Sequence, residues 1–98
     1  MSRVVWTDTA RADLRAIHSY ISKDSKQYAD GVISRIKSAT LRLRRFPLAG
    51  WMVSEWQDPD LREILSGNYR IIYRPDAGRV HILTVIHGAM QLPSSPGL

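Results

Sequence analysis

The chain has 98 residues and no cysteine, and its 14 basic residues outnumber its 9 acidic ones, which gives a formal charge of +5. Apolar residues make up 44% of the chain and charged residues 23%, as in folded globular proteins, so wholesale disorder is excluded. This length supports one domain with a single modest core. We expect that domain to span 1–98, with an ordered part of about 1–92 and a tail at 93–98.

Several classes of protein and site do not fit the sequence. Without cysteine, the chain has no disulfide framework, thiolate chemistry or zinc-thiolate site. The three histidines, His18, His81 and His87, lack a helical metal-binding spacing, so we expect neither a metal nor another cofactor. The first residues are too short an apolar run for a signal peptide, and no run approaches the roughly 20 apolar residues of a membrane span. We therefore expect a cytoplasmic protein without membrane contact.

Arginine dominates the positive charge, since 11 of the 14 basic residues are arginine. Its forked guanidinium suits hydrogen bonding to carboxylates and phosphates better than the lysine ammonium does. The composition thus indicates recognition of an anionic partner. An acidic protein, a nucleic acid and a membrane surface are all compatible with it.

The N-terminal half predicts a strand followed by two helices. Residues 4–6 favour a strand, and Thr7 and Asp8 then offer side-chain oxygens for a helix N-cap. Apolar residues at intervals of three and four predict a helix that ends near Lys23, and a second one from Tyr28 to residue 46, where Pro47 stops it. Asp24 and Ser25 form a short connection and offer a second helix N-cap, so the helices should pack as an antiparallel hairpin. Five basic residues of the second helix are interpreted as a solvated face, with a dedicated binding patch as the alternative: Arg35, Lys37, Arg42, Arg44 and Arg45.

The C-terminal half predicts a loop at 47–50, a segment at 51–56 that can be extended, and three strands at 61–65, 69–74 and 79–87. Turn residues separate these strands, which favours an antiparallel meander. Trp51 and Trp56 are interpreted as packing or partner-binding residues.

Strand geometry assigns the side chains to faces. In the middle strand, Tyr69, Ile71 and Tyr73 share one face, and Arg70, Ile72 and Arg74 share the other. In the last strand, strict alternation groups Val80, Ile82, Thr84 and Ile86 against Arg79, His81, Leu83, Val85 and His87. The predicted fold is α+β, with the two helices on one face of a small sheet. The other face is expected to be open, with arginines of the central strands pointing into it.

The chain resembles the ParE/RelE superfamily of bacterial toxins over nearly its whole length. The matching segments are Val4-Val5-Trp6-Thr7, Ala12-Asp13-Leu14 with Ile17, Phe46-Pro47-Leu48-Ala49-Gly50, Leu61-Arg62-Glu63, Tyr69-Arg70-Ile71-Ile72-Tyr73-Arg74 and Val85-Ile86-His87-Gly88-Ala89. The resemblance implies the toxin of a type II toxin-antitoxin system, also described as a plasmid stabilisation protein. It further implies neutralisation by a cognate antitoxin, acidic and partly disordered when free, in a hetero-oligomer.

The superfamily contains two activities, and the resemblance points to different residues for each. RelE-like members cut messenger RNA on the ribosome, and the candidates for that reaction here are Arg70, Arg74 and His87. The sequence departs from this pattern after the last strand, where Met90 stands at a position often held by arginine. Arginine is also a poor proton shuttle because it stays protonated, which leaves His87 as the plausible base. A His-Gly-Ala ending is frequent among ParE-like members, however, so the resemblance implies that His87 is structural.

We therefore expect a ParE-like toxin that is not an enzyme and that inhibits growth by binding a target such as DNA gyrase. The alternatives are a RelE-like ribosome-dependent endoribonuclease and a non-toxic antitoxin-binding homologue. Glu55 and Glu63 are interpreted as ion-pair partners of the arginines rather than catalytic carboxylates. The predicted partner-binding residues are Arg62, Glu63, Arg70, Arg74, Trp51 and Trp56.

Overall fold

The first strand, β1 (Arg3–Trp6), leads directly into a helical hairpin in the computed structural model, which describes residues 1–92. Thr7 caps α1 (Asp8–Ser22), because its hydroxyl accepts a hydrogen bond from Ala10 N–H at 3.2 Å. Ser25 caps α2 (Lys26–Leu41) in the same way, through Tyr28 N–H at 3.0 Å. Both predicted caps are confirmed. The predicted tail at 93–98 lies outside the described residues.

The second helix ends earlier than the sequence pattern predicts. It stops being α-helical at Leu41 and continues as a 3₁₀ turn, η1 (Arg42–Arg44), which buries Leu43 completely. Pro47 cannot donate a backbone hydrogen bond, and its ring would clash with the carbonyl four residues earlier in a continued α-helix. The carbonyl of Arg44 instead accepts a hydrogen bond from Ser2 N–H at 2.7 Å, so the end of the hairpin is attached to the start of β1.

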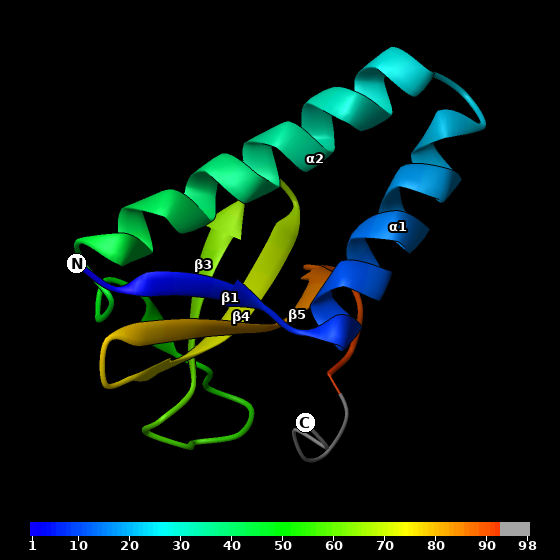
Figure 1. The fold of residues 1–98 in the computed structure, drawn as a ribbon. Helices are drawn as coiled ribbons and strands as arrows, with labels where there is room; N and C mark the ends of the chain where they lie inside the picture. Colours follow the sequence, from blue (N-terminus) through cyan, green and yellow to red (C-terminus); the bar gives the residue numbers. More distant parts are fainter. Residues whose placement is uncertain (93–98) are drawn as a thin grey trace.

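The strands form one five-stranded sheet in the order β1-β5-β4-β3-β2. They are β2 (Trp51–Met52), β3 (Arg62–Ser66), β4 (Tyr69–Asp76) and β5 (Arg79–His87). All neighbours are antiparallel except β1 and β5, which are parallel. Figure 1 shows both helices on one side of this sheet. The α+β fold, the helical hairpin and the three-stranded meander are therefore confirmed.

The main core lies between the helices and the sheet. Ala10, Leu14, Val32 and Ile36 face it from the helices, and the inward residues of β3, β4 and β5 complete it: Ile64, Ile71, Tyr73, Val80, Ile82 and Val85. Burying one large aliphatic side chain stabilises a fold by about 1.5–3 kcal/mol. Packing against this apolar core holds the helices on the sheet. No helix within residues 1–92 is long and apolar enough to cross a membrane.

The expectation of an open outer face is wrong for the part of the sheet around Ile72. A second cluster of buried residues, Val53, Leu61, Ile72 and Leu92, covers the side away from the helices. The segment at 51–56 supplies part of this cover because only its first two residues are a strand. The N–H groups of Trp56 and Gln57 both donate to the carbonyl of Val53, which turns the chain back over Ile72.

Strict alternation along β5 is also wrong. A register shift opposite Ile72 and Tyr73 leaves Leu83 as an extra residue in β5. Val85 consequently packs into the helix-side core, while Ile86 packs against the outer cluster. Each was predicted on the opposite face.

A carboxylate of α1 holds this bulge. Asp13 Oδ2 accepts hydrogen bonds from Val85 N–H at 2.9 Å and from Thr84 Oγ1 at 2.5 Å. The interaction joins the first helix to the last strand across more than 70 residues of sequence.

Tyr73 fixes the loop between η1 and β2. Its hydroxyl donates to Pro47 O and accepts from Gly50 N–H, each at 2.9 Å. A Cβ at Gly50 would lie 2.5 Å from Glu63 O and 2.8 Å from the Tyr73 hydroxyl, so only glycine fits there. This loop delivers the chain to β2 at the edge of the sheet.

Candidate functional site

The largest hollow that we describe lies on the outer face at the β2 edge of the sheet. It has a volume of about 760 Å³, and its lining includes Trp51, Met52, Leu65, Arg70 and His87. Trp51 is 70% exposed, and Met52 and Leu65 are each about half exposed. The hollow thus combines an exposed apolar edge with a charged floor.

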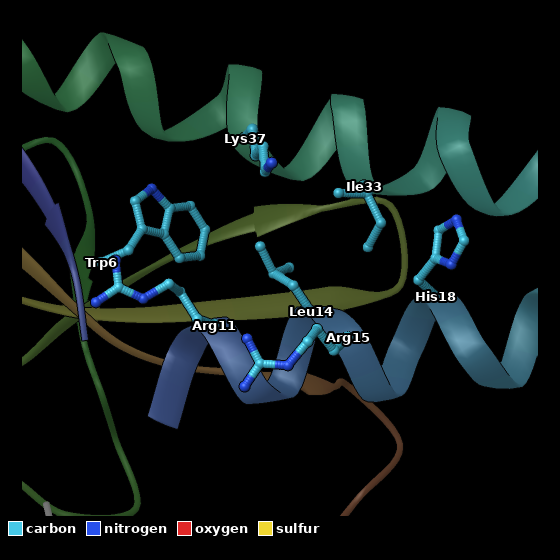
Figure 2. A pocket seen from close by; sticks show the side chains of 7 residues that line it. All are labelled: Trp6, Arg11, Leu14, Arg15, His18, Ile33 and Lys37. Atoms are coloured by element: carbon cyan, nitrogen blue, oxygen red, sulfur yellow. The ribbon is translucent and has the colours of Figure 1, made fainter. Parts of the chain in front are cut away.

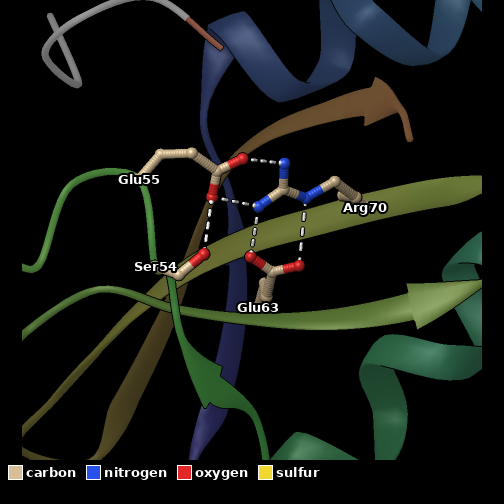
Figure 3. Close-up of polar contacts among 4 residues, drawn as sticks. All are labelled: Ser54, Glu55, Glu63 and Arg70. Carbon is tan, nitrogen blue, oxygen red and sulfur yellow. Dashed lines mark hydrogen bonds and ion pairs between the residues drawn. The ribbon is translucent and has the colours of Figure 1, made fainter. Parts of the chain in front are cut away.

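Arg70 forms that floor and is held by two carboxylates (Figure 3). Its Nη1 and Nη2 donate to the two oxygens of Glu55 at 2.7 and 2.9 Å. Its Nε and Nη2 donate to the two oxygens of Glu63 at 3.0 and 2.5 Å. Both pairs have the forked geometry of the strongest charge-assisted hydrogen bonds. We call Arg70, Glu55 and Glu63 the arginine clamp.

The local sequence explains the clamp. In the β3–β4 register, Leu65 pairs with Arg70 and Glu63 pairs with Ile72. Glu63 and Arg70 are therefore diagonal neighbours on one face, within reach of long side chains. Glu55 comes from the turn after β2, where Ser54 Oγ donates to it at 3.2 Å. The predicted role of both glutamates as arginine partners is confirmed.

The clamp carries a net charge of −1, from one guanidinium and two carboxylates. The hydrogen bonds that Glu55 accepts from Arg70 lower the pKa of Glu55 to about 2. The hydrogen bonds that Arg70 donates, to Glu55 first and to Glu63 second, raise the pKa of Arg70 above its usual value. The side chains of Arg70 and Glu63 are only 12% and 13% exposed, so the guanidinium presents little free positive charge to the hollow.

His87 lines the hollow at the end of β5, and its ring already contacts two neighbouring residues, Tyr69 and Ala89. It packs edge-on against Tyr69, with ring centroids 5.5 Å apart. Its Nδ1 accepts from Ala89 N–H at 3.1 Å. A neutral imidazole with Nδ1 as acceptor carries its proton on Nε2, which leaves that nitrogen unable to accept a proton.

The remaining predicted site residues lie elsewhere. Arg62 Nη1 donates to Leu48 O at 3.2 Å and to Gly50 O at 2.8 Å, so it supports the loop before β2. Arg74 pairs with His81 of β5 and lies four residues along β4 from Arg70, about 13 Å away. Trp56 packs against the outer core cluster. The structure therefore brings Trp51, Glu63, Arg70 and His87 together, but not Arg62, Arg74 or Trp56.

A second cavity was not predicted from the sequence and lies between the two helices (Figure 2). It has a volume of about 480 Å³, and Trp6, Leu14 and Ile33 form its apolar part. Figure 2 shows cationic side chains from both helices at this groove: Arg11 and Arg15 of α1 and Lys37 of α2. A sign of this groove was present in the sequence, since these basic residues flank the apolar stripes of both helices.

The other histidines contact single carboxylates. His18 Nε2 lies 2.7 Å from Asp30 Oδ1, and Lys26 also bonds to Asp30 at 2.8 Å. These hydrogen bonds, Lys26 first, lower the pKa of Asp30. His81 lies 3.9 Å from Asp76. Among residues 1–92, no three histidine, aspartate or glutamate side chains gather as a metal site would require.

The arrangement of a first strand, a helical hairpin and a meander in one sheet is the fold of ParE/RelE-like proteins of known structure. A chain of the chromosomal ParDE toxin-antitoxin system from P. aeruginosa has the same fold. It superposes with a TM-score of 0.75 at 21% identity, and the match covers 89% of this chain and 96% of that chain. A chain of the RelBE2 toxin-antitoxin complex from Mycobacterium tuberculosis has a TM-score of 0.55 at 28% identity, covering 88% and 96%.

Sequence comparison gives the family within this class. The family described as ParE toxin of type II toxin-antitoxin system matches residues 4–92. A relative from Caulobacter vibrioides, Toxin RelE2, is 37% identical over 90 residues, which is 91% of this chain and 98% of that protein. The chain therefore belongs to the ParE toxin family of type II toxin-antitoxin systems, which confirms the resemblance predicted from the sequence.

Proposed function

We propose that this toxin arrests growth by binding a protein target, DNA gyrase, rather than by cutting RNA. The arginine clamp is the observation that carries this proposal. Cleavage at a ribose requires positive charge on the phosphorane, and preorganised charge of this kind is a large part of such catalysis. A guanidinium shared by two ionised carboxylates is poorly suited to that task, because an approaching phosphate meets a net charge of −1.

Proton transfer supports the same conclusion. General acid-base help is commonly worth about 10²- to 10⁴-fold in rate. His87 would have to break its hydrogen bond with Ala89 N–H before Nδ1 could accept a proton. Met90 and Gln91, which follow, supply no proton-transfer group. The surface is better suited to binding than to ribose chemistry.

The exposed edge of the hollow supports an antitoxin partner. Trp51, Met52 and Leu65 are apolar and exposed beside the clamp. β2 pairs with β3 on one side and is the outermost strand of the sheet, so an extended segment can add to it. We propose that a segment of the antitoxin folds onto this edge through its apolar side chains, with Trp51 as its main apolar contact.

The target is tested by inducing the toxin in bacteria, then assaying DNA supercoiling and messenger RNA integrity in the same cells. We expect a loss of supercoiling and a DNA-damage response while messages stay intact. Cleaved messages with normal supercoiling would overturn the proposal. An antitoxin encoded in the neighbouring reading frame should restore growth and bind at micromolar concentration or tighter.

A ribosome-dependent endoribonuclease is the second candidate, because Arg70 and His87 line the same hollow. Arg70→Ala separates the two functions. In a ribonuclease this change would abolish cleavage while antitoxin binding persists. In a gyrase inhibitor neither form would cut RNA, whether or not ribosomes are present.

A further inference from the structure

The half of the outer sheet face nearest β1 is strongly basic. Val4 and Val80 point to the helix-side core, so their strand neighbours point outwards. The distance of 3.9 Å between His81 Nε2 and Asp76 Oδ2 agrees with this assignment. Two cross-strand rows result: Arg3, Arg79 and Asp76 form one, and Val5, His81 and Arg74 form the next.

The positive charge continues around the β1 edge. Ser2 N–H donates to Arg44 O, which places η1 beside the first row, and Arg44 and Arg45 are both exposed. Arg3, Arg44, Arg45, Arg74 and Arg79 together form what we call the basic face, with Asp76 as the carboxylate within its rows. These side chains come from distant parts of the sequence.

The basic face differs from the arginine clamp on the same side of the sheet. Arg70 is neutralised by two glutamates. In the rows of the basic face, adjacent strands place Arg3 beside Arg79, and strands lie about 4.8 Å apart, so like charges are neighbours. Such a pair is unfavourable, and Asp76 supplies one negative charge in the two rows against the three arginines Arg3, Arg74 and Arg79.

We propose that the basic face binds the phosphate backbone of duplex DNA. A protein interface normally has an apolar centre, whereas Val5 is the single apolar side chain in the two rows. Single-stranded nucleic acid is usually held by stacking on aromatic rings, and the two rows contain no phenylalanine, tyrosine or tryptophan. Closely spaced guanidinium groups on a sheet suit the outward phosphates of a duplex, whose bases are already paired. DNA binding by the basic face does not require gyrase, so a failure of the gyrase proposal would not refute it, and the reverse also holds.

The test measures binding of the full chain to a fluorescently labelled 20-base-pair duplex by anisotropy, over a series of salt concentrations. The variant Arg3→Gln/Arg79→Gln removes the first row. The matched control Arg11→Gln/Arg15→Gln removes two exposed arginines from α1, and both variants change the net charge from +5 to +3, since 5 minus 2 is 3. Circular dichroism and thermal melting establish that all three proteins fold equally well.

We expect the row variant to bind about 10- to 60-fold more weakly than wild type at 0.1 M salt. Its slope of log K against log salt should fall by about 1.8, because each phosphate contact contributes about 0.9. The control should lose less than about threefold. Equal losses in the two variants would show that net charge alone is responsible and would overturn the proposal. It would equally be overturned by absence of binding at low salt, or by tighter binding to an RNA hairpin or to vesicles with anionic lipid.

Discussion

Asp13→Ala should destabilise this protein far more than the removal of any exposed carboxylate from the same helix. Asp13 Oδ2 is the acceptor for Val85 N–H and for Thr84 Oγ1 at the β5 bulge. Val85 and Thr84 are almost completely buried, at 2% and 9% exposure. Alanine would leave both donors without this acceptor in a place that water reaches poorly.

The expected loss follows from these two contacts. A hydrogen bond to a charged group contributes about 1.5–3 kcal/mol, and an unsatisfied buried donor costs about 1–3 kcal/mol. The Thr84 hydroxyl can rotate towards another acceptor, whereas the Val85 N–H is fixed by the strand. We therefore expect the free energy of unfolding to fall by about 3 kcal/mol, out of the 5–15 kcal/mol typical of such domains. For a domain of this size that corresponds to a Tm lower by roughly 10–20 °C.

Urea denaturation followed by tryptophan fluorescence measures the change, with Asp8→Ala as the control. Asp8 lies in the first turn of α1 and pairs with Arg11 at an exposed position, so its removal should cost less than about 1 kcal/mol. The double variant Asp13→Ala/Thr84→Val should lose less than the sum of the two single variants, since the two side chains act together. If Asp13→Ala were no less stable than Asp8→Ala, the proposed role of Asp13 in holding the bulge would be wrong.

Three further predictions concern the loop before β2 and the clamp. Gly50→Ala should lower the free energy of unfolding by about 1–3 kcal/mol, because its methyl group would meet Glu63 O and the Tyr73 ring; an unchanged urea midpoint would refute this. Tyr73→Phe should cost about 1–3 kcal/mol by the same measurement, because it leaves Gly50 N–H without its acceptor. Because Arg70 lowers the pKa of Glu55 from 4.5 to about 2, the stability contributed by this ion pair is complete above about pH 4.5 and is lost as the pH falls towards 2. Urea midpoints of Glu55→Gln should therefore fall less steeply than those of wild type over that range, and parallel curves would contradict the clamp.

The elements of the fold were predictable because each has a local cause. Thr7 and Ser25 are N-cap residues that indicate where the two helices begin, and the spacing of apolar residues identifies the buried face of each helix. Turn residues around Gly67 and Gly78, both of which adopt positive φ, separate the strands. The parallel pairing of β1 with β5 joins segments far apart in the sequence, and no residue near β1 indicates which strand it pairs with.

The wrong predictions on the faces of β5 and on the open outer face also have specific causes. An extra residue at Leu83 reverses the faces of Val85 and Ile86, and it depends on contacts with α1 that lie far away in the sequence. The outer face was expected to be open because both predicted helices were placed on the other face of the sheet. Val53 and Leu61, two apolar residues in a segment without regular periodicity, instead anchor a cover over it.

The candidate site was predicted in its chemistry but not in its geometry. Glu55 and Glu63 were predicted to be arginine partners because an acid beside several arginines stays ionised. That both bind Arg70 depends on the β3–β4 register and on a turn after β2. Arg74 and Arg70 share a sequence pattern but have different surroundings. Charge complementarity can be read from a sequence, whereas the choice among equivalent arginines requires the fold.

Supercoiling of a relaxed plasmid by purified gyrase tests the proposal that this toxin inhibits gyrase by binding it. We predict that increasing amounts of the toxin inhibit supercoiling and that a stoichiometric amount of antitoxin restores it. Gyrase that remains fully active in excess toxin would contradict the claim.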